Sequence, residues 1–151
     1  MDKQEFSLSE YEETIRTVLE SGGEFRIYPK GTSMLPLIRA GLDSVCLEKP
    51  SGNLKKGDIA FYLRDSGEYI LHRVIKAEDG IYTICGDNQV TLEKGIENRH
   101  IIGYVTKIYR GEKLITPTNK GYRLYLFLWR SFLLRRVFFK LRTVFGKGRK
   151  G

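Results

Sequence analysis

A series of short, β-like segments between residues 25 and 109 most constrains the fold of this chain. Each segment is rich in β-branched and aromatic residues, and turn-forming residues separate one segment from the next. The segments show no regular alternation with helices, which disfavours a doubly wound α/β fold. The spacing predicts a mostly β domain, a small and partly open barrel or sandwich. Its predicted strands are 25–28, 45–47, 59–63, 69–75, 81–84 and 101–109.

Helical signals lie on either side of this β region. Residues 7–21 carry an apolar stripe at helical spacing, and a Gly-Gly pair ends the pattern. Residues 122–145 have helical composition with aromatic side chains throughout. The chain therefore divides into three parts: an N-terminal helix (1–23), a β domain (24–119) and a basic, aromatic C-terminal tail (120–151).

The positive charge of the chain is concentrated in this tail. Residues 1–119 hold 16 Lys and Arg against 18 Asp and Glu, whereas residues 120–151 hold ten Lys and Arg and no acidic residue. The body is nearly neutral, so we expect it not to bind nucleic acid. On one continuous helix the charges of 122–145 do not fall on one face. We expect 122–145 to attach the body to an anionic membrane surface, and packing against the body is the alternative.

The few cysteines and histidines argue against a disulfide framework and a metal site. Cys46 and Cys85 lack metal-ligand spacing, and His72 and His100 are the two histidines of the chain. We expect two buried, reduced thiols, no metal and no cofactor. The first residues lack the pattern of a secretion signal, and no apolar run reaches the roughly 20 residues of a spanning helix. The expected location of the body is the cytoplasm, with peripheral attachment to a membrane.

The most specific motif is the segment 31–36, Gly-Thr-Ser-Met-Leu-Pro. Gly31 permits a tight backbone, and Pro36 opposes immediate helix formation. This arrangement would expose the Ser33 hydroxyl beside free backbone N–H groups, as an oxyanion hole requires. The alternative interpretation is an ordinary turn that leads into a short helix over 35–40.

Three weaker motifs follow the serine motif. A Gly-Asp-Ile turn at 57–59 begins a predicted strand. His72 shares a strand face with apolar neighbours, while Arg73 points to the other side. A Gly-Asp-Asn turn at 86–88 then follows a predicted hairpin. Taken singly, a histidine on an apolar face is usually a satisfied structural residue, and an aspartate in a turn usually caps its own backbone.

Taken together and in this order, the four motifs resemble the type I signal peptidase family, in the archaeal and endoplasmic-reticulum branch that uses a histidine base. The resemblance covers residues 28–108, just over half of the chain. It implies a mostly β catalytic domain, a serine endopeptidase activity and an extended leader or precursor peptide as substrate. Family members usually carry a membrane-spanning helix before the serine motif, whereas this chain has a short polar helix there.

The resemblance also implies roles for individual residues. Ser33 would be the nucleophile, and His72 would be the base that removes its proton. Asp87 matches the family's acid and would orient the imidazole of His72. The family has a second aspartate six residues further on, where this chain has Glu93, so Glu93 is the alternative orienting acid.

The rest of the serine motif would complete an oxyanion hole. The Ser33 backbone N–H would be one donor. Some family members place a side-chain hydroxyl two residues before the nucleophile, but this chain has Gly31 there. A second backbone donor or Thr32 would therefore have to serve, and Met34 would pack beside the serine. Since every motif precedes residue 109, the sequence predicts that the tail is dispensable for the chemistry.

Two other functions are compatible with these motifs. A LexA-like self-cleaving peptidase would need a lysine base, and Lys76, the lysine nearest to His72, lies beyond the matched motif. Residues 1–24 also hold one predicted helix, which is too little for the helix-turn-helix that many such proteins carry. The second alternative is a non-catalytic peptide-binding module on the same fold, which the change to Glu93 and the missing spanning helix motivate.

Overall fold

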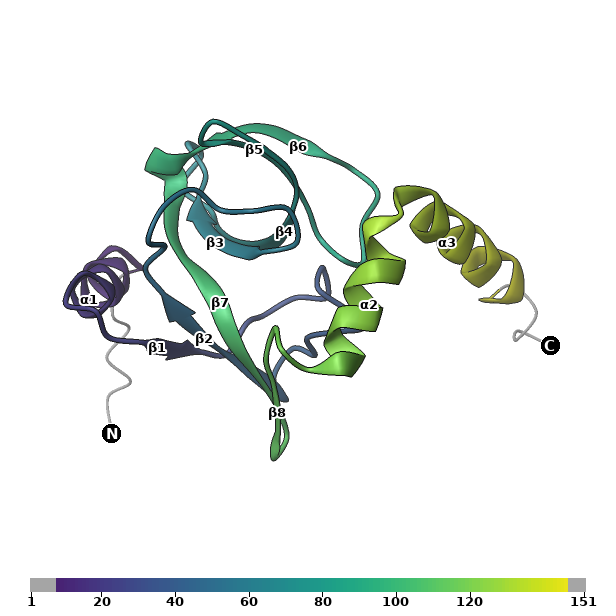
Figure 1. Ribbon diagram of the computed structural model, residues 1–151, viewed down its shortest axis with the longest axis horizontal. Helices are drawn as coiled ribbons and strands as arrows, with labels where there is room; N and C mark the ends of the chain where they lie inside the picture. The colour runs from purple at the N-terminus through teal and green to yellow at the C-terminus, as the bar shows by residue number, and fades with distance from the viewer. Residues whose placement is uncertain (1–7, 147–151) are drawn as a thin grey trace.

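The computed structural model describes residues 8–146, in which a β domain lies between one N-terminal helix and two C-terminal helices (Figure 1). The helices are α1 (Leu8–Glu20), α2 (Lys120–Arg130) and α3 (Phe132–Gly146), and a 3₁₀ turn, η1, covers Asn98–His100. The strands are β1 (Phe25–Ile27), β2 (Asp43–Glu48), β3 (Ile59–Leu63), β4 (Tyr69–Glu78), β5 (Ile81–Cys85), β6 (Glu93–Glu97), β7 (Ile101–Arg110) and β8 (Lys113–Ile115).

The strands form one antiparallel sheet with two free ends. Its order is β1-β2-β7-β3-β4-β5-β6, and β8 pairs with β7. The β4–β5 hairpin turns at Asp79 and Gly80, whose φ angles are 47° and 79°. Two successive positive φ angles are what a type I′ turn requires. The predicted mostly β fold with an open sheet is therefore confirmed.

Strand β3 is buried on both faces and separates two hydrophobic cores. Ile59 and Phe61 lie in a core that also receives the apolar stripe of α1. Ala60 and Tyr62 lie in a second core with residues of β5 and β6. Successive side chains of a strand point to opposite faces, so one continuous apolar run fills both cores.

All six predicted strands are present, and β6 and β8 are the two that the sequence pattern does not predict. In β6 only Ile96 is buried, and β8 has no buried residue. Both strands pair on one side only, β6 with β5 and β8 with β7. A strand at the edge of a sheet needs few apolar residues, so the alternating pattern that marks the other strands is missing.

The structure differs from the sequence analysis at two segments with helical signals, the alternative helix over 35–40 and the single tail helix. Residues 35–40 form turns rather than a short helix, with one α-type bond from the Ile38 N–H to the Met34 carbonyl (3.0 Å). The tail forms two helices instead of one, because the helical backbone breaks at Ser131. The Ser131 hydroxyl accepts a hydrogen bond from the Leu134 N–H (3.4 Å), as a residue that caps a helix start does.

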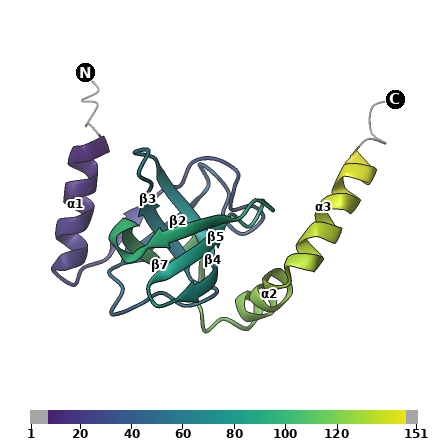
Figure 2. The ribbon, with the colours of Figure 1, turned by 90° about the horizontal axis from the view of Figure 1, so that it is seen from above.

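The two C-terminal helices lie differently on the body. Helix α2 packs against the β domain, and α3 leads away from it (Figures 1 and 2). Tyr122, Tyr125 and Trp129 stack along one face of α2, with 6.4 Å and 5.1 Å between successive ring centroids. Tyr122 and Tyr125 pack on the first core. Among residues 8–146, no helix combines the length and apolar character needed to cross a membrane.

Candidate active site

The serine motif forms a run of turns between β1 and β2. Gly31 has a φ of 82°, which glycine adopts without strain. Ser33 is partly buried and Thr32 is exposed, while Met34 is buried in the first core as the sequence predicts. Within residues 8–146, the backbone N–H of Ser33 has no acceptor in the chain. This donor is therefore free to bind a ligand.

Ser33 and His72 line the same small cavity. Its volume is about 100 Å³. His72 comes from β4, where it pairs with Ala60 of β3, and its ring meets Tyr62 edge-on at 6.5 Å between centroids. No hydrogen bond joins the Ser33 hydroxyl to the His72 ring among the described residues, and such contacts commonly tighten only when substrate binds. The structure thus brings together the two side chains that the sequence pairs.

The His72 ring is buried but keeps access to this cavity. His72 is 6% exposed, and its ring has no hydrogen-bond partner within the described residues. Every fully buried side-chain nitrogen and oxygen in that part of the chain does have a partner. An unpartnered ring nitrogen must therefore reach accessible space, and the cavity is the space that His72 lines.

Burial also keeps the His72 ring neutral. Burial first, and the charge of Arg64 second, lower the pKa of His72 to about 4, against the opposing effects of Glu93 and Asp87. Below that pH the ring carries a proton, and above it the ring is neutral. At neutral pH one ring nitrogen of His72 can therefore accept a proton.

The turn at 86–89 holds the serine motif in place. The Asn88 N–H donates to the Ser33 carbonyl (2.8 Å), and the Asn88 side-chain amide donates to the Thr32 carbonyl (3.1 Å). A Cβ on Gly86 would lie 2.6 Å from the Ser33 carbonyl oxygen, so glycine is required there. The Gly-Asp-Asn motif therefore positions the backbone of the proposed nucleophile.

Asp87 lies at the centre of a fully buried ion network. Two hydrogen bonds of 2.7 Å join it to Nε and Nη2 of Arg73, and others come from Nη2 of Arg135 (3.3 Å) and the Tyr125 hydroxyl (2.8 Å). A bidentate pair of this kind fixes the carboxylate in one plane. The family resemblance implies that Asp87 orients the ring of His72. Within the described residues, however, no hydrogen bond of the Asp87 carboxylate goes to the His72 ring. Its charge acts on His72 through space.

Glu93, the alternative acid, is held by other partners as well. Its carboxylate accepts from the Tyr62 hydroxyl (2.7 Å) and from Nε and Nη2 of Arg64 (2.8 Å each). The Arg64 hydrogen bonds lower the pKa of Glu93, which is therefore ionised at neutral pH. No hydrogen bond joins Glu93 to His72 in the part of the chain that the structure describes. Neither acid forms a hydrogen-bonded triad in this structure.

The C-terminal helices join the network directly, which the sequence does not predict. Trp129 Nε1 donates to the Asp87 carbonyl (2.8 Å), and Nη1 of the buried Arg135 donates to the Gly86 carbonyl (3.1 Å). Deleting the tail would remove these donors, so the tail is not independent of the site. Arginine is rarely buried, and no local pattern distinguishes Arg135 from the other basic residues of the tail.

A second, larger cavity adjoins the first. It measures about 430 Å³ and shares Pro29, Lys30, Tyr69 and Leu71 with the cavity of Ser33. Its lining is mainly apolar and aromatic and comes from α1, β3, β4 and the segment after β1. Lys30 has no site role in the sequence analysis, yet its exposed side chain lines both cavities. The two cavities therefore lie next to each other, on either side of their shared lining residues.

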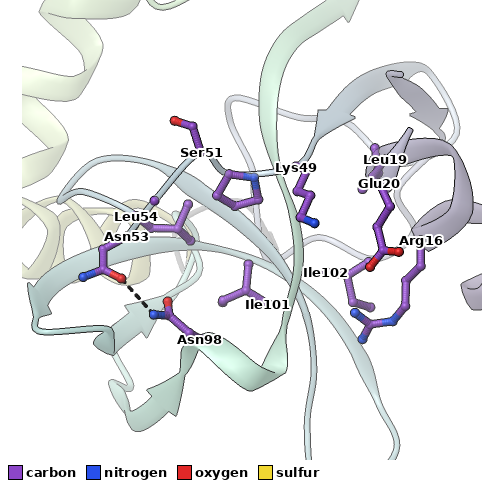
Figure 3. Close-up of a pocket in the computed structure, with 12 residues that line it drawn as sticks. Arg16, Leu19, Glu20, Lys49, Ser51, Asn53, Leu54, Asn98, Ile101 and Ile102 are labelled. Atoms are coloured by element: carbon purple, nitrogen blue, oxygen red, sulfur yellow. Dashed lines mark hydrogen bonds between the residues drawn. The ribbon is translucent and has the colours of Figure 1, made fainter. Parts of the chain in front are cut away.

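A third cavity lies elsewhere, between α1, the loop 49–54 and the start of β7 (Figure 3). Its volume is about 340 Å³. On one side the Asn98 amide donates a 2.8 Å hydrogen bond to Asn53 Oδ1 (Figure 3). Ser51 lines this cavity, but no histidine does. The third cavity therefore lacks the pairing of a hydroxyl with a base that the first one has.

The cysteines and the acidic residues form no metal centre within residues 8–146. No group of three or more His, Cys, Asp or Glu residues there could hold a metal ion. Cys46 and Cys85 are buried and free, as predicted. Burial raises the pKa of both thiols, so both are protonated at neutral pH.

Comparisons with protein-family models, with curated proteins and with solved structures find no match to this chain. The resemblance to type I signal peptidases consequently depends on the four sequence motifs. The shared cavity of Ser33 and His72 is an independent, geometric observation. It is the basis for the function proposed below.

Proposed function

We propose that the protein is a serine endopeptidase of the signal-peptidase type, with Ser33 as nucleophile and His72 as general base. One observation carries the proposal. Ser33 and a neutral, unpartnered His72 line one cavity although they come from separate elements of the fold. A serine hydroxyl is a weak nucleophile at neutral pH, and a neutral imidazole in reach is the usual means of activating it.

The proposed reaction uses three groups of this chain: the Ser33 hydroxyl, the His72 ring and the Ser33 backbone N–H. His72 takes the hydroxyl proton of Ser33 while Oγ attacks the carbonyl carbon of the scissile bond. The carbonyl oxygen becomes an oxyanion, to which the free Ser33 N–H donates. The carbon–nitrogen bond then breaks, and the imidazolium gives its proton to the leaving amine. A water, deprotonated by His72, hydrolyses the ester and restores the Ser33 hydroxyl.

We propose a dyad of Ser33 and His72, in which the two acids Glu93 and Asp87 act on His72 by their charge and not by a hydrogen bond. The charges of Glu93 and Asp87 favour the protonated form of His72 that arises during each step. Burial and Arg64 disfavour it. The imidazolium is therefore a strong acid, which promotes proton transfer to the leaving amine. The 86–89 turn would act through the backbone of Ser33.

The proposed substrate is an extended leader or precursor peptide. The cavity of Ser33 is small, about 100 Å³, and the adjoining one is larger and mainly apolar, about 430 Å³. A small residue next to the cleaved bond and a larger apolar residue further along would fit this order. An extended peptide could also pair with backbone groups beside β4.

The activity test uses a fluorophosphonate probe, which labels activated serines, and a leader-type peptide. Ser33→Ala should abolish both labelling and cleavage, and His72→Gln should lower both rates about a hundredfold to ten-thousandfold. The matched controls are Ser51→Ala in the third cavity and His100→Gln. Equal cleavage by the wild type, Ser33→Ala and His72→Gln proteins would contradict the proposal.

A non-catalytic peptide-binding module is the second candidate function. One observation favours it: within residues 8–146 no hydrogen bond connects His72 to Ser33, Asp87 or Glu93. Tight binding of a leader peptide without cleavage or Ser33 labelling would support the module. A LexA-like lysine base has less support, because Lys76 is 62% exposed and pairs with Glu78 at 2.8 Å.

We also propose where the activity takes place. The body would face the cytoplasm and attach peripherally to a membrane. The uneven charge supports this location, because ten Lys and Arg and no acidic residue lie in 120–151. Clustered cations attract anionic head groups by about 1 kcal/mol each near the surface.

A further inference from the structure

Helices α2 and α3 each leave a row of large apolar side chains exposed. Each member lies three or four residues from another member of the same helix, which places the set on one side of each helix. We call this set the tail apolar surface. It comprises Leu124, Phe127 and Leu128 on α2 and Leu134, Val137, Phe138 and Leu141 on α3.

Other side chains of these helices make the contacts with the body. On α2, Tyr125 and Trp129 face the domain and donate to Asp87. On α3, Arg135 is buried against Asp87 and the Gly86 carbonyl. The tail apolar surface therefore lies on the sides of the helices that do not make these polar contacts. Exposed apolar side chains in continuous rows commonly mark an interaction site.

Because the helix breaks at Ser131, the charges of α3 are placed around α3 alone. They are scattered when 122–145 is drawn as one continuous helix. With 100° per residue, Lys140 lies along one flank of the α3 row and Arg142 along the other, while Arg136 lies on the side opposite to the row. Arg142 Nη1 also donates a hydrogen bond to Asn88 Oδ1 (3.3 Å). All three side chains are exposed. No acidic residue follows Glu112 in the sequence. The apolar row is thus bordered on both flanks by cations, with no carboxylate among them.

We propose that the tail apolar surface binds an anionic lipid bilayer, with its apolar side chains among the acyl chains and the flanking cations on the head groups. This inference deepens the proposed function: it rests on the proposed peripheral location and is independent of the peptidase chemistry. Charge complementarity selects the partner. A second copy of the chain would bring the same cations to the contact, and like charges oppose such pairing.

The experiment measures sedimentation of the full chain with vesicles of phosphatidylcholine alone or mixed with phosphatidylglycerol. We expect binding to the mixed vesicles that weakens as salt rises, and little binding to the neutral ones. Lys140→Gln with Arg142→Gln should lower the partition coefficient roughly thirtyfold, at about 1 kcal/mol per cation. Leu134→Gln with Leu141→Gln should lower it at least tenfold.

Matched control substitutions distinguish binding by the tail apolar surface from the general effect of losing any exposed cation or apolar side chain. Lys55→Gln with Lys56→Gln removes two exposed cations from the β domain, and Leu42→Gln removes an exposed apolar side chain there. Neither should change vesicle binding more than twofold or so. Labelling of Ser33 by the fluorophosphonate and the melting temperature are followed in every variant, so loss of lipid binding is distinguished from loss of the peptidase or of the fold.

Three outcomes would overturn the inference. The first is equal partition into neutral and anionic vesicles. The second is full binding by the Leu134→Gln, Leu141→Gln protein. The third is a dimer in sedimentation equilibrium that these substitutions dissolve, with no vesicle binding by the wild type, since the surface would then be a contact between copies.

Discussion

The two histidines of the chain are equally buried, at 6% exposure each, yet they stand in opposite chemical situations. His100 uses both ring nitrogens: Nδ1 accepts from the Glu97 N–H (2.9 Å), and Nε2 lies 3.2 Å from Asp65 Oδ1. His72 has no such partner within residues 8–146 and lines a cavity with Ser33. Burial alone therefore does not mark a functional histidine. What distinguishes the proposed base His72 is a buried ring without a partner, on one cavity with a hydroxyl.

The two sites also differ in how they are built. The His100 site is mostly local, since η1 and the residue before it supply one partner and a nearby loop supplies the other. The His72 site needs β4, the serine motif, the 86–89 turn and both C-terminal helices. The ring of His100 is satisfied by its neighbours, whereas distant elements surround the ring of His72, the proposed base, and leave it without a partner among the described residues.

The largest difference expected between the two histidines is in activity. His72→Gln should lower peptide cleavage by about a hundredfold to ten-thousandfold, because the general base is lost. His100→Gln should leave cleavage within a fewfold of the wild type, since its ring bonds to Glu97 and Asp65 and, within residues 8–146, to no group of the proposed site. Steady-state cleavage of one leader-type peptide measures both. Equal losses in the two variants would remove the distinction between the sites.

A second contrast concerns the acids near the two rings. Asp87→Asn would leave the buried guanidiniums of Arg73 and Arg135 without their carboxylate, at a cost of roughly 3 to 5 kcal/mol in the free energy of unfolding. Asp65 is 73% exposed, so Asp65→Asn should leave the free energy of unfolding nearly unchanged. Urea unfolding at neutral pH gives both values. A small cost for Asp87→Asn would show that the buried network does not hold the site.

The pH dependence of stability sharpens the comparison further. The folded pKa of His72 is about 4, below its ordinary value near 6.5 in the unfolded chain. Between these values the unfolded chain binds the extra proton, so stability falls as the pH falls from 6.5 towards 4. The loss should reach roughly 2 to 3 kcal/mol and be absent from His72→Gln. Parallel unfolding curves for the two proteins across this window would contradict the burial of a neutral ring.

The smallest predicted effect concerns Asn88, which holds the serine motif through the Thr32 carbonyl. Asn88→Ala removes the side-chain donor and the acceptor of an exposed hydrogen bond from Arg142 (3.3 Å), but keeps the backbone bond to Ser33. We therefore expect kcat to fall roughly tenfold with little change in KM. Asn53→Ala is the matched control, because Asn53 accepts a comparable bond from Asn98 in the turn of His100. If the two variants lost activity equally, Asn88 would have no special part in positioning Ser33.

Much of the fold follows from the sequence because the central strands alternate or run apolar. The segment 59–63 is apolar throughout, and it is buried on both faces. Strand β6 could not be predicted in this way, since only Ile96 is buried there. The break at Ser131 also escapes prediction, because both flanking segments have helical composition.

The candidate site likewise has a part that the sequence predicts and a part that it does not. Ser33 and His72 stand in motifs whose order along the chain carries information, and the structure places them on one cavity. The partners of Asp87 could not be foreseen, because Arg135 is distant in sequence and most arginines stay in water. Long-range burial of a charged group depends on the whole packing, which no local pattern encodes.

The pH dependence of fluorophosphonate labelling at Ser33, with the modified residue identified by peptide mapping, tests the central claim most directly. If a buried, neutral His72 is the base, the labelling rate should rise with pH through a limb near its pKa of about 4 and be level across neutral pH. His72→Gln should remove that limb together with most of the rate. A limb above about pH 8 that persists in His72→Gln would contradict the account, because it would place the activation of Ser33 on a lysine.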